Sequence, residues 1–283
     1  PFVIFGGFGY ASTPADIGFL NDLWRSTDGQ SWEWLGGSTL LDPHGSYSSV
    51  VPWPGGREGH SLVRLGDAVL LFAGAGMAAS GPSGYLNDLW KLADNTQWTW
   101  LGGSSTINAR GVMETSESRR WPGSRRGHVA WTVDDSTAFI YGGEGYLRWA
   151  TDACAGASPD GLLEECDGGG VCVPRGTCAS NHEAGYLNDL WQLRRTATDV
   201  FSWECMGGKL HVDASSRYGA RGVALASNWP GGRVSSAACT VAGSGWMFGG
   251  LGFARDGTFG TLAELWGHDG ELWTFYGGEA ADA

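Results

Sequence analysis

Four of the six cysteines lie in one segment, residues 144–186, and they are the side chains in this chain best suited to covalent or metal chemistry: Cys154, Cys166, Cys172 and Cys178. A short segment that buries little apolar surface is commonly held together by disulfides. Four cysteines allow three pairings, and on local spacing we favour Cys154–Cys166 with Cys172–Cys178. The alternative is a zinc site, but intervals of eleven and five residues between the cysteines match no usual zinc-binding spacing.

The same segment is acidic, with seven carboxylates against two arginines. Hard cations take oxygen ligands, so a calcium site is the alternative to a solvated acidic loop. Its ligands would be Asp160, Glu164, Glu165 and Asp167. We favour the solvated loop and predict no cofactor, with calcium as the one exception.

The other two cysteines are Cys205 and Cys239. We interpret both as buried thiols that act as small hydrophobic side chains. A disulfide between them is the alternative, but we place them on outer and inner strands of different repeat units, which is poor geometry for a bond.

The histidines give little sign of catalysis. His60 and His128 follow Arg57 and Arg125 at equal spacing, which favours a structural role, and the other four are scattered. The sequence contains no nucleophile elbow, no paired His-x-x-x-His and no phosphate-binding loop. We therefore favour a protein that is not an enzyme.

Composition narrows the class of protein further. The formal net charge of −12 disfavours nucleic acid, which needs a basic surface, and docking on anionic lipid. The longest nearly apolar run, residues 68–79, is too short for a spanning helix. A hydrophobic content of 42% with 16 tryptophans excludes global disorder, and 48 glycines indicate many turns and few helices.

Three signatures recur in fixed order along the chain. They are an apolar run ending in a small pair, as in Phe5-Gly6-Gly7, then Leu-Asn-Asp-Leu-Trp, as in residues 20–24, then Trp-x-Trp-Leu-Gly-Gly, as in residues 32–37. A fourth, Trp-Pro-Gly-Gly-Arg, as in residues 53–57, lies between consecutive copies. In the last copy the second signature decays to Leu-Ala-Glu-Leu-Trp, residues 262–266.

Each signature is interpreted as one short strand. The Trp-x-Trp spacing places both rings on one face, and the glycine pairs supply turns and close backbone approach. We interpret Asn-Asp as a turn that leads into a strand. Thirteen of the tryptophans occupy repeated positions, and we interpret them as buried side chains of the fold. Four strands per period make an antiparallel unit, which must pack on its neighbours to cover both faces. A β-sandwich is the alternative fold.

The signatures resemble those of kelch repeats. The resemblance is carried by the strand-end glycine pair, by residues 85–90 and by Trp98-Thr99-Trp100, and it covers nearly the whole chain outside Glu144 to Gly185. It implies that each repeat is one blade of a β-propeller, of the long-repeat type similar to secreted and cell-surface kelch proteins. Some kelch-like propellers resemble copper radical oxidases, but nothing in this sequence marks the Tyr, Cys and His cluster of that chemistry.

We expect an all-β fold made of one propeller segment over residues 1–283. Strands two to four of one blade lie at 1–37, three blades lie at 53–103, 121–208 and 229–278, and residues 144–186 form the cysteine-rich acidic insertion. This gives about four blades, whereas kelch propellers resemble six- or seven-bladed rings. We therefore expect the chain to be part of a longer protein.

Alternating strand direction should place the short turns at one face of the blades and the long connections at the other. Loops on a rigid scaffold carry binding, so we expect an interaction module that binds a protein or glycoprotein through the long-loop face, within a larger assembly. Disulfides in the insertion indicate an extracellular or cell-surface location. The alternatives are a carbohydrate-active enzyme of the copper oxidase or epimerase type and a lectin-like glycan binder. The candidate contact residues are Tyr146, Arg148, Trp149 and His182.

Overall fold

The computed structural model describes residues 2–12, 16–48, 50–93, 96–113, 120–147, 184–209 and 211–278, and the backbone of 164–166 and 172–174. Within these residues the regular structure is entirely β, with no helix, and the paired strands run antiparallel. The predicted all-β class is therefore confirmed. No helix in this part of the chain has the length and apolarity that a membrane span requires.

The chain divides into two compact units. The first comprises Pro1–Ala109 with Ser124–Arg126, and the second comprises Arg110–Gly123 with Gly127–Ala283. The strands of the first unit are β1 (Phe2–Tyr10), β2 (Ile17–Ser26), β3 (Glu33–Gly36), β4 (Arg57–Glu58), β5 (Ser61–Leu65), β6 (Ala68–Met77), β7 (Ser83–Ala93), β8 (Gln97–Gly102) and β11 (Arg125–Arg126).

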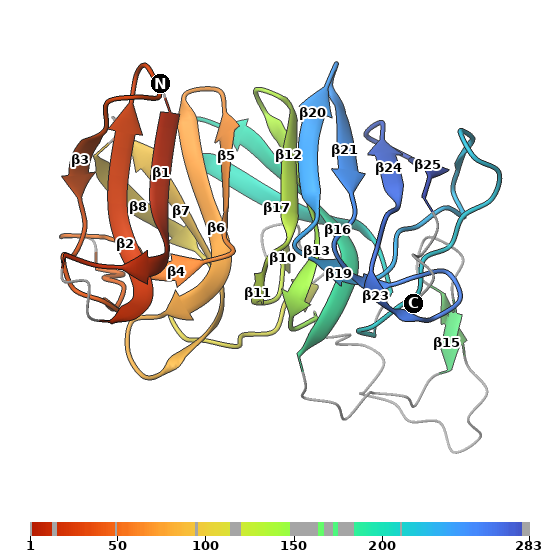
Figure 1. Ribbon diagram of the computed structural model, residues 1–283, viewed down its shortest axis with the longest axis horizontal. Coiled ribbons are helices and arrows are strands. Elements are labelled where there is room, and N and C mark those ends of the chain that lie inside the picture. Colours follow the sequence, from red (N-terminus) through yellow and green to blue (C-terminus); the bar gives the residue numbers. More distant parts are fainter. Residues whose placement is uncertain are drawn as a thin grey trace. The chain divides into compact units, whose positions relative to one another are not determined.

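The first unit contains two antiparallel sheets. One has the order β1-β2-β3 and the other the order β5-β6-β7-β8, so neighbours in sequence are neighbours in the sheet (Figure 1). β4 pairs with the end of β6 beyond its bulge, where Arg57 lies opposite Gly76. Long strand β6 is buried along almost its whole length because it has a strand on each side and a sheet against its face.

The second unit is built in the same way. Its strands are β9 (Val112–Met113), β10 (Arg120–Trp121), β12 (Val129–Asp134), β13 (Thr137–Gly145), β14 (Glu164–Cys166), β15 (Cys172–Pro174), β16 (Gly185–Ala197), β17 (Val200–Gly207), β18 (Ala224–Leu225), β19 (Arg233–Val234), β20 (Ala237–Val241), β21 (Ser244–Phe248), β22 (Leu251–Phe253), β23 (Phe259–Thr261), β24 (Leu265–His268) and β25 (Trp273–Gly277).

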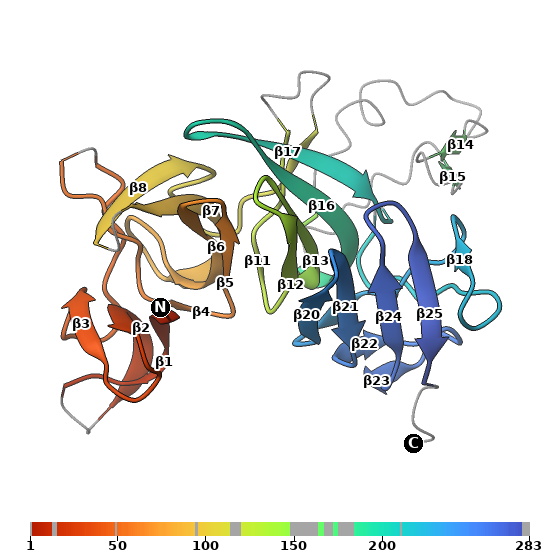
Figure 2. The same cartoon turned by 90° about the horizontal axis from the view of Figure 1, so that it is seen from above.

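Two sheets of the second unit follow sequence order, β12-β13-β16-β17 and β20-β21-β24-β25, and β18 is added beside β25. Figure 2 shows β20, β21, β24 and β25 side by side. Smaller pairings join β19, β22 and β23, join β9 to β10, and join β14 to β15.

Each unit has an aromatic core between its sheets. In the first unit Phe5 and Leu23 of one sheet pack against Leu71, Trp90 and Trp98 of the other. The second unit buries nine residues in a cluster of the same kind, to which both of its larger sheets contribute: Val129, Trp131, Phe139, Tyr141, Leu190, Met247, Trp266, Trp273 and Phe275. Sheets with one apolar face gain most of their stability from this mutual burial.

The interpretation of thirteen tryptophans as buried scaffold is wrong for three of them. Trp32, Trp34 and Trp100 are 38%, 50% and 36% exposed. Trp34 lies in β3 and Trp32 directly before it, and Trp100 lies in β8. Each of these strands is the last of its sheet and has a partner on one side only. The repeat predicts where these tryptophans lie in the strands, but it does not predict which of them a neighbouring element buries.

One glycine position explains the pair that ends the Trp-x-Trp signature. At Gly103, φ is +87°, and an added Cβ would lie 2.4 Å from the carbonyl oxygen of Asn87 and 2.7 Å from the Cα of Asp88. Gly37 stands in the same relation to Asn21 and Asp22. The second glycine is therefore required because the chain crosses directly over the Asn-Asp dipeptide of the neighbouring strand.

Candidate functional site

The Asn-Asp dipeptides lie within strands, so their interpretation as turns is wrong. Asn21 and Asp22 belong to β2, and Asn87 and Asp88 belong to β7. Their side chains bond to distant segments of the chain instead of to a local turn. Turn propensity describes what a short polar side chain does when no tertiary partner is present, and here such partners are present.

The asparagine links one sheet to the segment that begins the next. Asn21 Nδ2 donates to the carbonyl of Pro54 at 3.0 Å, and its Oδ1 accepts from the backbone of Ser38 at 2.8 Å. In return, the Trp53 indole donates to the backbone carbonyl of Asn21 at 2.9 Å. In the second unit the matching bonds join Asn188 to Pro230, Lys209 and Trp229. The Asn and Trp-Pro-Gly signatures are thus the two halves of one contact.

The carboxylate of this signature, which follows an asparagine in three copies and Ala263 in the last, accepts the indole N–H of the tryptophan two residues later. The two side chains share one face of the strand because side chains alternate with period 2. The four bonds measure between 2.6 and 3.0 Å and join Trp24 to Asp22, Trp90 to Asp88, Trp191 to Asp189 and Trp266 to Glu264. Each carboxylate therefore satisfies an indole N–H, which would be costly to bury alone.

In the first unit the same carboxylate also pairs with a fully buried arginine. Arg57 Nη1 and Nη2 lie 2.6 and 2.8 Å from the two carboxylate oxygens of Asp88, and neither side chain is exposed. The guanidinium also donates to the carbonyls of Gly55 and Ala73. The Tyr47 hydroxyl donates to Asp88 Oδ2 at 2.6 Å.

Burial alone would raise the pKa of Asp88, but the charge of Arg57 and the hydrogen bonds it accepts hold that pKa below its ordinary value. The pKa of Tyr47 is raised by burial and by the charge of Asp88. Taking two charges out of water costs several kcal/mol per ion, and only complete hydrogen bonding offsets that cost. Here the carboxylate accepts from three side chains, so Arg57 and Asp88 are charged and paired while Tyr47 is neutral.

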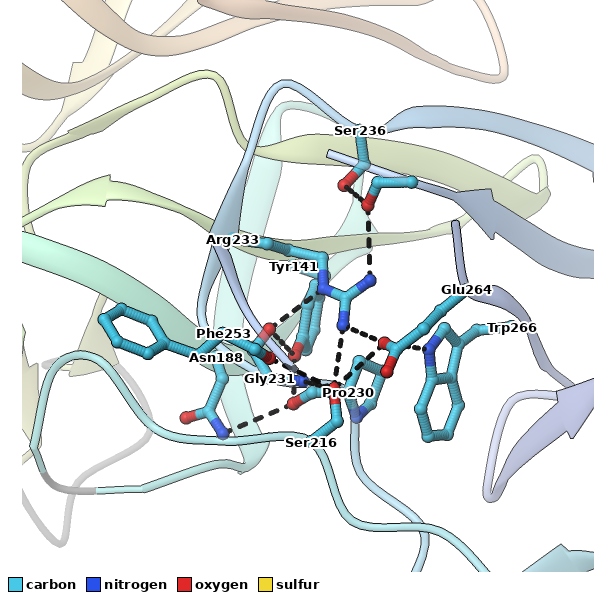
Figure 3. A network of polar contacts seen from close by, with 11 residues as sticks. Tyr141, Asn188, Ser216, Pro230, Gly231, Arg233, Ser236, Phe253, Glu264 and Trp266 are labelled. Carbon is cyan, nitrogen blue, oxygen red and sulfur yellow. Dashed lines mark hydrogen bonds and ion pairs between the residues drawn. The ribbon is translucent and has the colours of Figure 1, made fainter. Parts of the chain in front are cut away.

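The second unit contains a corresponding pair with different chemistry. Arg233 of β19 bonds to Glu264, and both side chains are buried (Figure 3). The Ser216 hydroxyl, which is within hydrogen-bond distance of both, donates to Glu264 Oε2 at 2.9 Å and accepts from Arg233 Nη2 at 3.0 Å. Among the described residues, Glu264 Oε1 has no hydrogen-bond partner. Glu264 thus binds its arginine through one carboxylate oxygen, whereas Asp88 binds Arg57 through both.

This difference changes the position of a tyrosine. The bridges Ser46–Trp53 and Arg217–Trp229 place Tyr47 and Tyr218 at equivalent positions of their connections. Tyr47 points at the buried carboxylate. In the second unit Ser216 supplies the hydroxyl instead, and the Tyr218 ring stacks on Phe275 with centroids 3.8 Å apart.

Tyr218 lines an open pocket of about 320 Å³. The pocket residues come from two long connections of the second unit, 209–229 and 251–261: Ser216, Arg217, Tyr218, Gly219, Ser227 and Arg255. The guanidinium carbon of Arg255 lies 4.9 Å from the centroid of the Tyr218 ring. The described residues of the lining are cationic, aromatic or small, and none of them carries a carboxylate, an imidazole or a thiol.

The long connections of the first unit also meet one another. The backbone N–H of Asp42, in connection 38–52, donates to the carbonyl of Phe19 at 2.9 Å. Within the same connection, Gly45 donates to the carbonyl of Ala78 at 3.0 Å. In the first unit, the connection between the two sheets is thus hydrogen-bonded to connections that join strands of one sheet. In the second unit, the corresponding connections together line the pocket.

Most of the site residues expected from the sequence lie outside the described residues. These are Arg148, Trp149, Cys154, Asp160, Asp167, Cys178 and His182. Tyr146 is described and partly buried, and its carbonyl lies where a Cβ on Gly123 would be, which places it against the chain near β10. Only the backbone is described for Glu164, Glu165, Cys166 and Cys172, and in the β14–β15 pair Cys166 lies directly opposite Cys172.

The prediction of two buried thiols is wrong for Cys239, which is exposed on β20. Cys205 is partly buried. Its Sγ donates to the carbonyl of Gly207 at 3.7 Å, just as the Trp100 indole donates to Gly102. Among the described residues, no three side chains of His, Cys, Asp or Glu cluster as metal ligands would.

Two histidines are held uncharged by the fold. His268 is 2% exposed and lies against Phe139 and Trp273. Burial lowers the pKa of His268 from 6.5 to about 4. Burial, together with the charge of Arg57, lowers the pKa of His60 to about 3. Both imidazole rings therefore act as structural side chains that pack against aromatic neighbours.

We expect this burial to make stability depend on pH. Below pH 6.5 the unfolded chain takes up a proton on His268 while the folded chain does not, so the free energy of unfolding falls as pH falls. The expected slope is about 1.4 kcal/mol per pH unit from this one residue, down to the folded pKa near 4. Urea unfolding at pH 7 and pH 5.5 measures it, and the His268→Gln variant should lose this part of the slope. Exposed His211 is the control: a His211→Gln variant that loses as much slope would contradict the assignment.

Comparison with known proteins adds little to these observations. No family model matches the sequence, and no curated protein matches it. A solved structure titled "Structure of YjhT" is 13% identical, covers 97% of this chain and 84% of that chain, and superposes with a TM-score of 0.33. A similarity at this level carries no argument, so the assignment of function depends on the residues themselves.

Proposed function

We propose that the chain is a segment of a kelch-type β-propeller that acts as an interaction module outside the cell or on its surface. It binds a protein or glycoprotein partner through the long connections and is not an enzyme. The observation that carries this proposal is the pocket of the second unit. Two long connections meet there and present two arginines and a tyrosine, side chains suited to binding, and among the described residues that line the pocket none is a histidine, a cysteine or a carboxylate.

The propeller is supported by the repeated contact between sheets. In the first unit, Asn21 of one sheet is hydrogen-bonded to Trp53 and Pro54, which lie just before the next sheet. In the second unit, Asn188 makes the same bonds to Trp229 and Pro230. The same contact thus recurs in both units and links a sheet to its successor through the same residue types. This is what radial blades need, whereas a β-sandwich has no reason to repeat it.

Photo-cross-linking on cells that make the protein tests the proposal. Ser227→p-benzoylphenylalanine places a probe on the pocket, and Asp135→p-benzoylphenylalanine places one on the exposed turn between β12 and β13 in the same unit. We expect position 227 to trap one defined partner that position 135 does not trap. Identical products at both positions, or products from position 135 alone, would contradict binding through the long connections.

The enzyme and lectin alternatives each have a direct check. Stoichiometric copper in the purified protein would favour the oxidase, and a defined hit on a glycan array would favour the lectin. No contact among the described residues favours either.

A further inference from the structure

The pocket of the second unit concentrates unpaired positive charge in an acidic chain. Arg217 and Arg255 are both exposed, and within the described part of the chain neither forms an ion pair. The chain as a whole carries a formal net charge of −12, so carboxylates are abundant elsewhere. Two arginines line one concave site, and among the described residues neither has a carboxylate partner, so we infer that their charge is available to a ligand.

The backbone is held in position at both arginines, and the Arg255 side chain also has an aromatic contact. The backbone of Arg217 exchanges two hydrogen bonds with Trp229, both 2.7 Å long. Arg255 follows Ala254, which closes a turn by accepting from Gly257 and donating to Thr258. Its guanidinium rests over the Tyr218 ring. A site whose charged groups are ordered before binding loses less conformational entropy when the ligand arrives.

The first unit lacks this site because of particular residues. The position equivalent to Arg217 is Ser46. Met77 and Phe253 make the same backbone bond to Gly56 and Gly232, which makes Ala79 the equivalent of Arg255. In the first unit the tyrosine is also held by Asp88. In the second unit, Glu264 stands at the position of Asp88 and accepts from Ser216, and Tyr218 lines the pocket.

The geometry of Tyr218 indicates the kind of anion. Phe275 stacks in parallel on its ring, and the Arg255 guanidinium carbon lies 4.9 Å from the centroid of the same ring. The Tyr218 ring therefore already contacts an aromatic and a cationic side chain, which disfavours a sugar ring stacking on it. The pocket is lined by Arg217 and Arg255. A planar guanidinium group can bind a carboxylate through two parallel hydrogen bonds.

We propose that this pocket binds the carboxylate side chains of an acidic peptide segment, with Arg217 and Arg255 as the specificity-determining residues. The inference rests on the proposed interaction function and names the chemistry of the partner. Planar guanidinium groups discriminate a carboxylate from its uncharged amide, so charge should decide binding more than shape does. Because the arginines are exposed, salt should weaken the interaction.

The test uses a fluorescein-labelled hexaglutamate peptide and its hexaglutamine counterpart, measured by fluorescence anisotropy against the full chain. We expect hexaglutamate to bind, hexaglutamine to bind at least tenfold more weakly, and Arg217→Met and Arg255→Met each to weaken hexaglutamate binding tenfold or more. Arg64→Met is the matched control, since Arg64 is an exposed arginine of the first unit, and it should leave the affinity unchanged.

Three outcomes would overturn the inference: no binding of hexaglutamate at millimolar concentration, equal binding of hexaglutamine, or equal losses in the Arg64→Met variant. Polygalacturonate forms a separate arm, and binding of this acidic polysaccharide in place of the peptide would also overturn it. Failure here is distinguishable from failure of the proposed function. A partner cross-linked at position 227 while hexaglutamate fails to bind would refute the acidic peptide and leave the interaction module standing.

Discussion

Replacement of Arg57 by methionine is expected to lower the free energy of unfolding of the first unit by about 3–5 kcal/mol, the range for breaking a buried ion pair from one side. Methionine fills much of the same volume, so the loss arises mainly from charge. Asp88 would remain fully buried with only Tyr47 and Trp90 as donors, and the carbonyls of Gly55 and Ala73 would lose theirs. Urea unfolding followed by tryptophan fluorescence measures the change.

An exposed ion pair of the same unit is the matched control. Arg25 and Glu33 form a salt bridge in which the two side chains are 33% and 60% exposed, and exposed pairs are worth about 0–1 kcal/mol. Arg25→Met should therefore cost far less than Arg57→Met. The double variant Arg57→Met with Asp88→Leu should recover part of the loss, because it removes the unpaired charge but also takes away the acceptor of Tyr47 and Trp90. Equal losses for Arg25→Met and Arg57→Met would refute this account.

The strands could be predicted from the sequence because their signatures are local. An apolar run ending in a glycine pair, or Trp-x-Trp followed by one, specifies strand and turn within a few residues. The Asn-Asp dipeptide misled the prediction for the same reason. Its local preference is for turns, and what holds Asn21 within β2 is its bonding to Pro54, 33 residues later.

The buried ion pairs left a signal that depends on the whole repeat. Arg57 precedes Asp88 by 31 residues, and Arg233 precedes Glu264 by 31 residues. A constant interval between an arginine and an acidic residue, kept even where aspartate becomes glutamate, indicates that the two side chains meet. In the sequence, both arginines end a Trp-Pro-Gly-Gly-Arg signature, and in the structure they lie in β4 and β19.

The pocket could not be predicted from the signatures. Tyr47 and Tyr218 occupy the same place in the repeat, and only three-dimensional packing distinguishes a tyrosine bonded to a carboxylate from one stacked on Phe275. The replacement Ala263-Glu264 was visible as a departure from the repeat. Its consequence depends on Ser216, 48 residues earlier, which takes the position of the buried hydroxyl donor.

Replacement of Trp90 by alanine is expected to lower the free energy of unfolding of the first unit by about 3–5 kcal/mol, the usual cost of emptying a large aromatic site. The Trp90 side chain is 0% exposed and packs in the core with Leu71 and Trp98. Its indole N–H also donates to Asp88 at 2.7 Å, so the variant removes a donor from the buried ion pair as well. Chemical unfolding of the purified variant measures the loss.

Trp100 is a precise control because it is the register partner of Trp90 on the next strand. It is the same residue type in the same sheet, but it is 36% exposed and its indole donates to a nearby carbonyl, that of Gly102. Trp100→Ala should cost about 1 kcal/mol, since a partly exposed site leaves little cavity behind. If the two variants lose the same free energy, burial between sheets is not what holds this unit together. A much larger loss for Trp90→Ala would establish that the tryptophan of the Asp-Leu-Trp signature stabilises the fold by packing sheet against sheet.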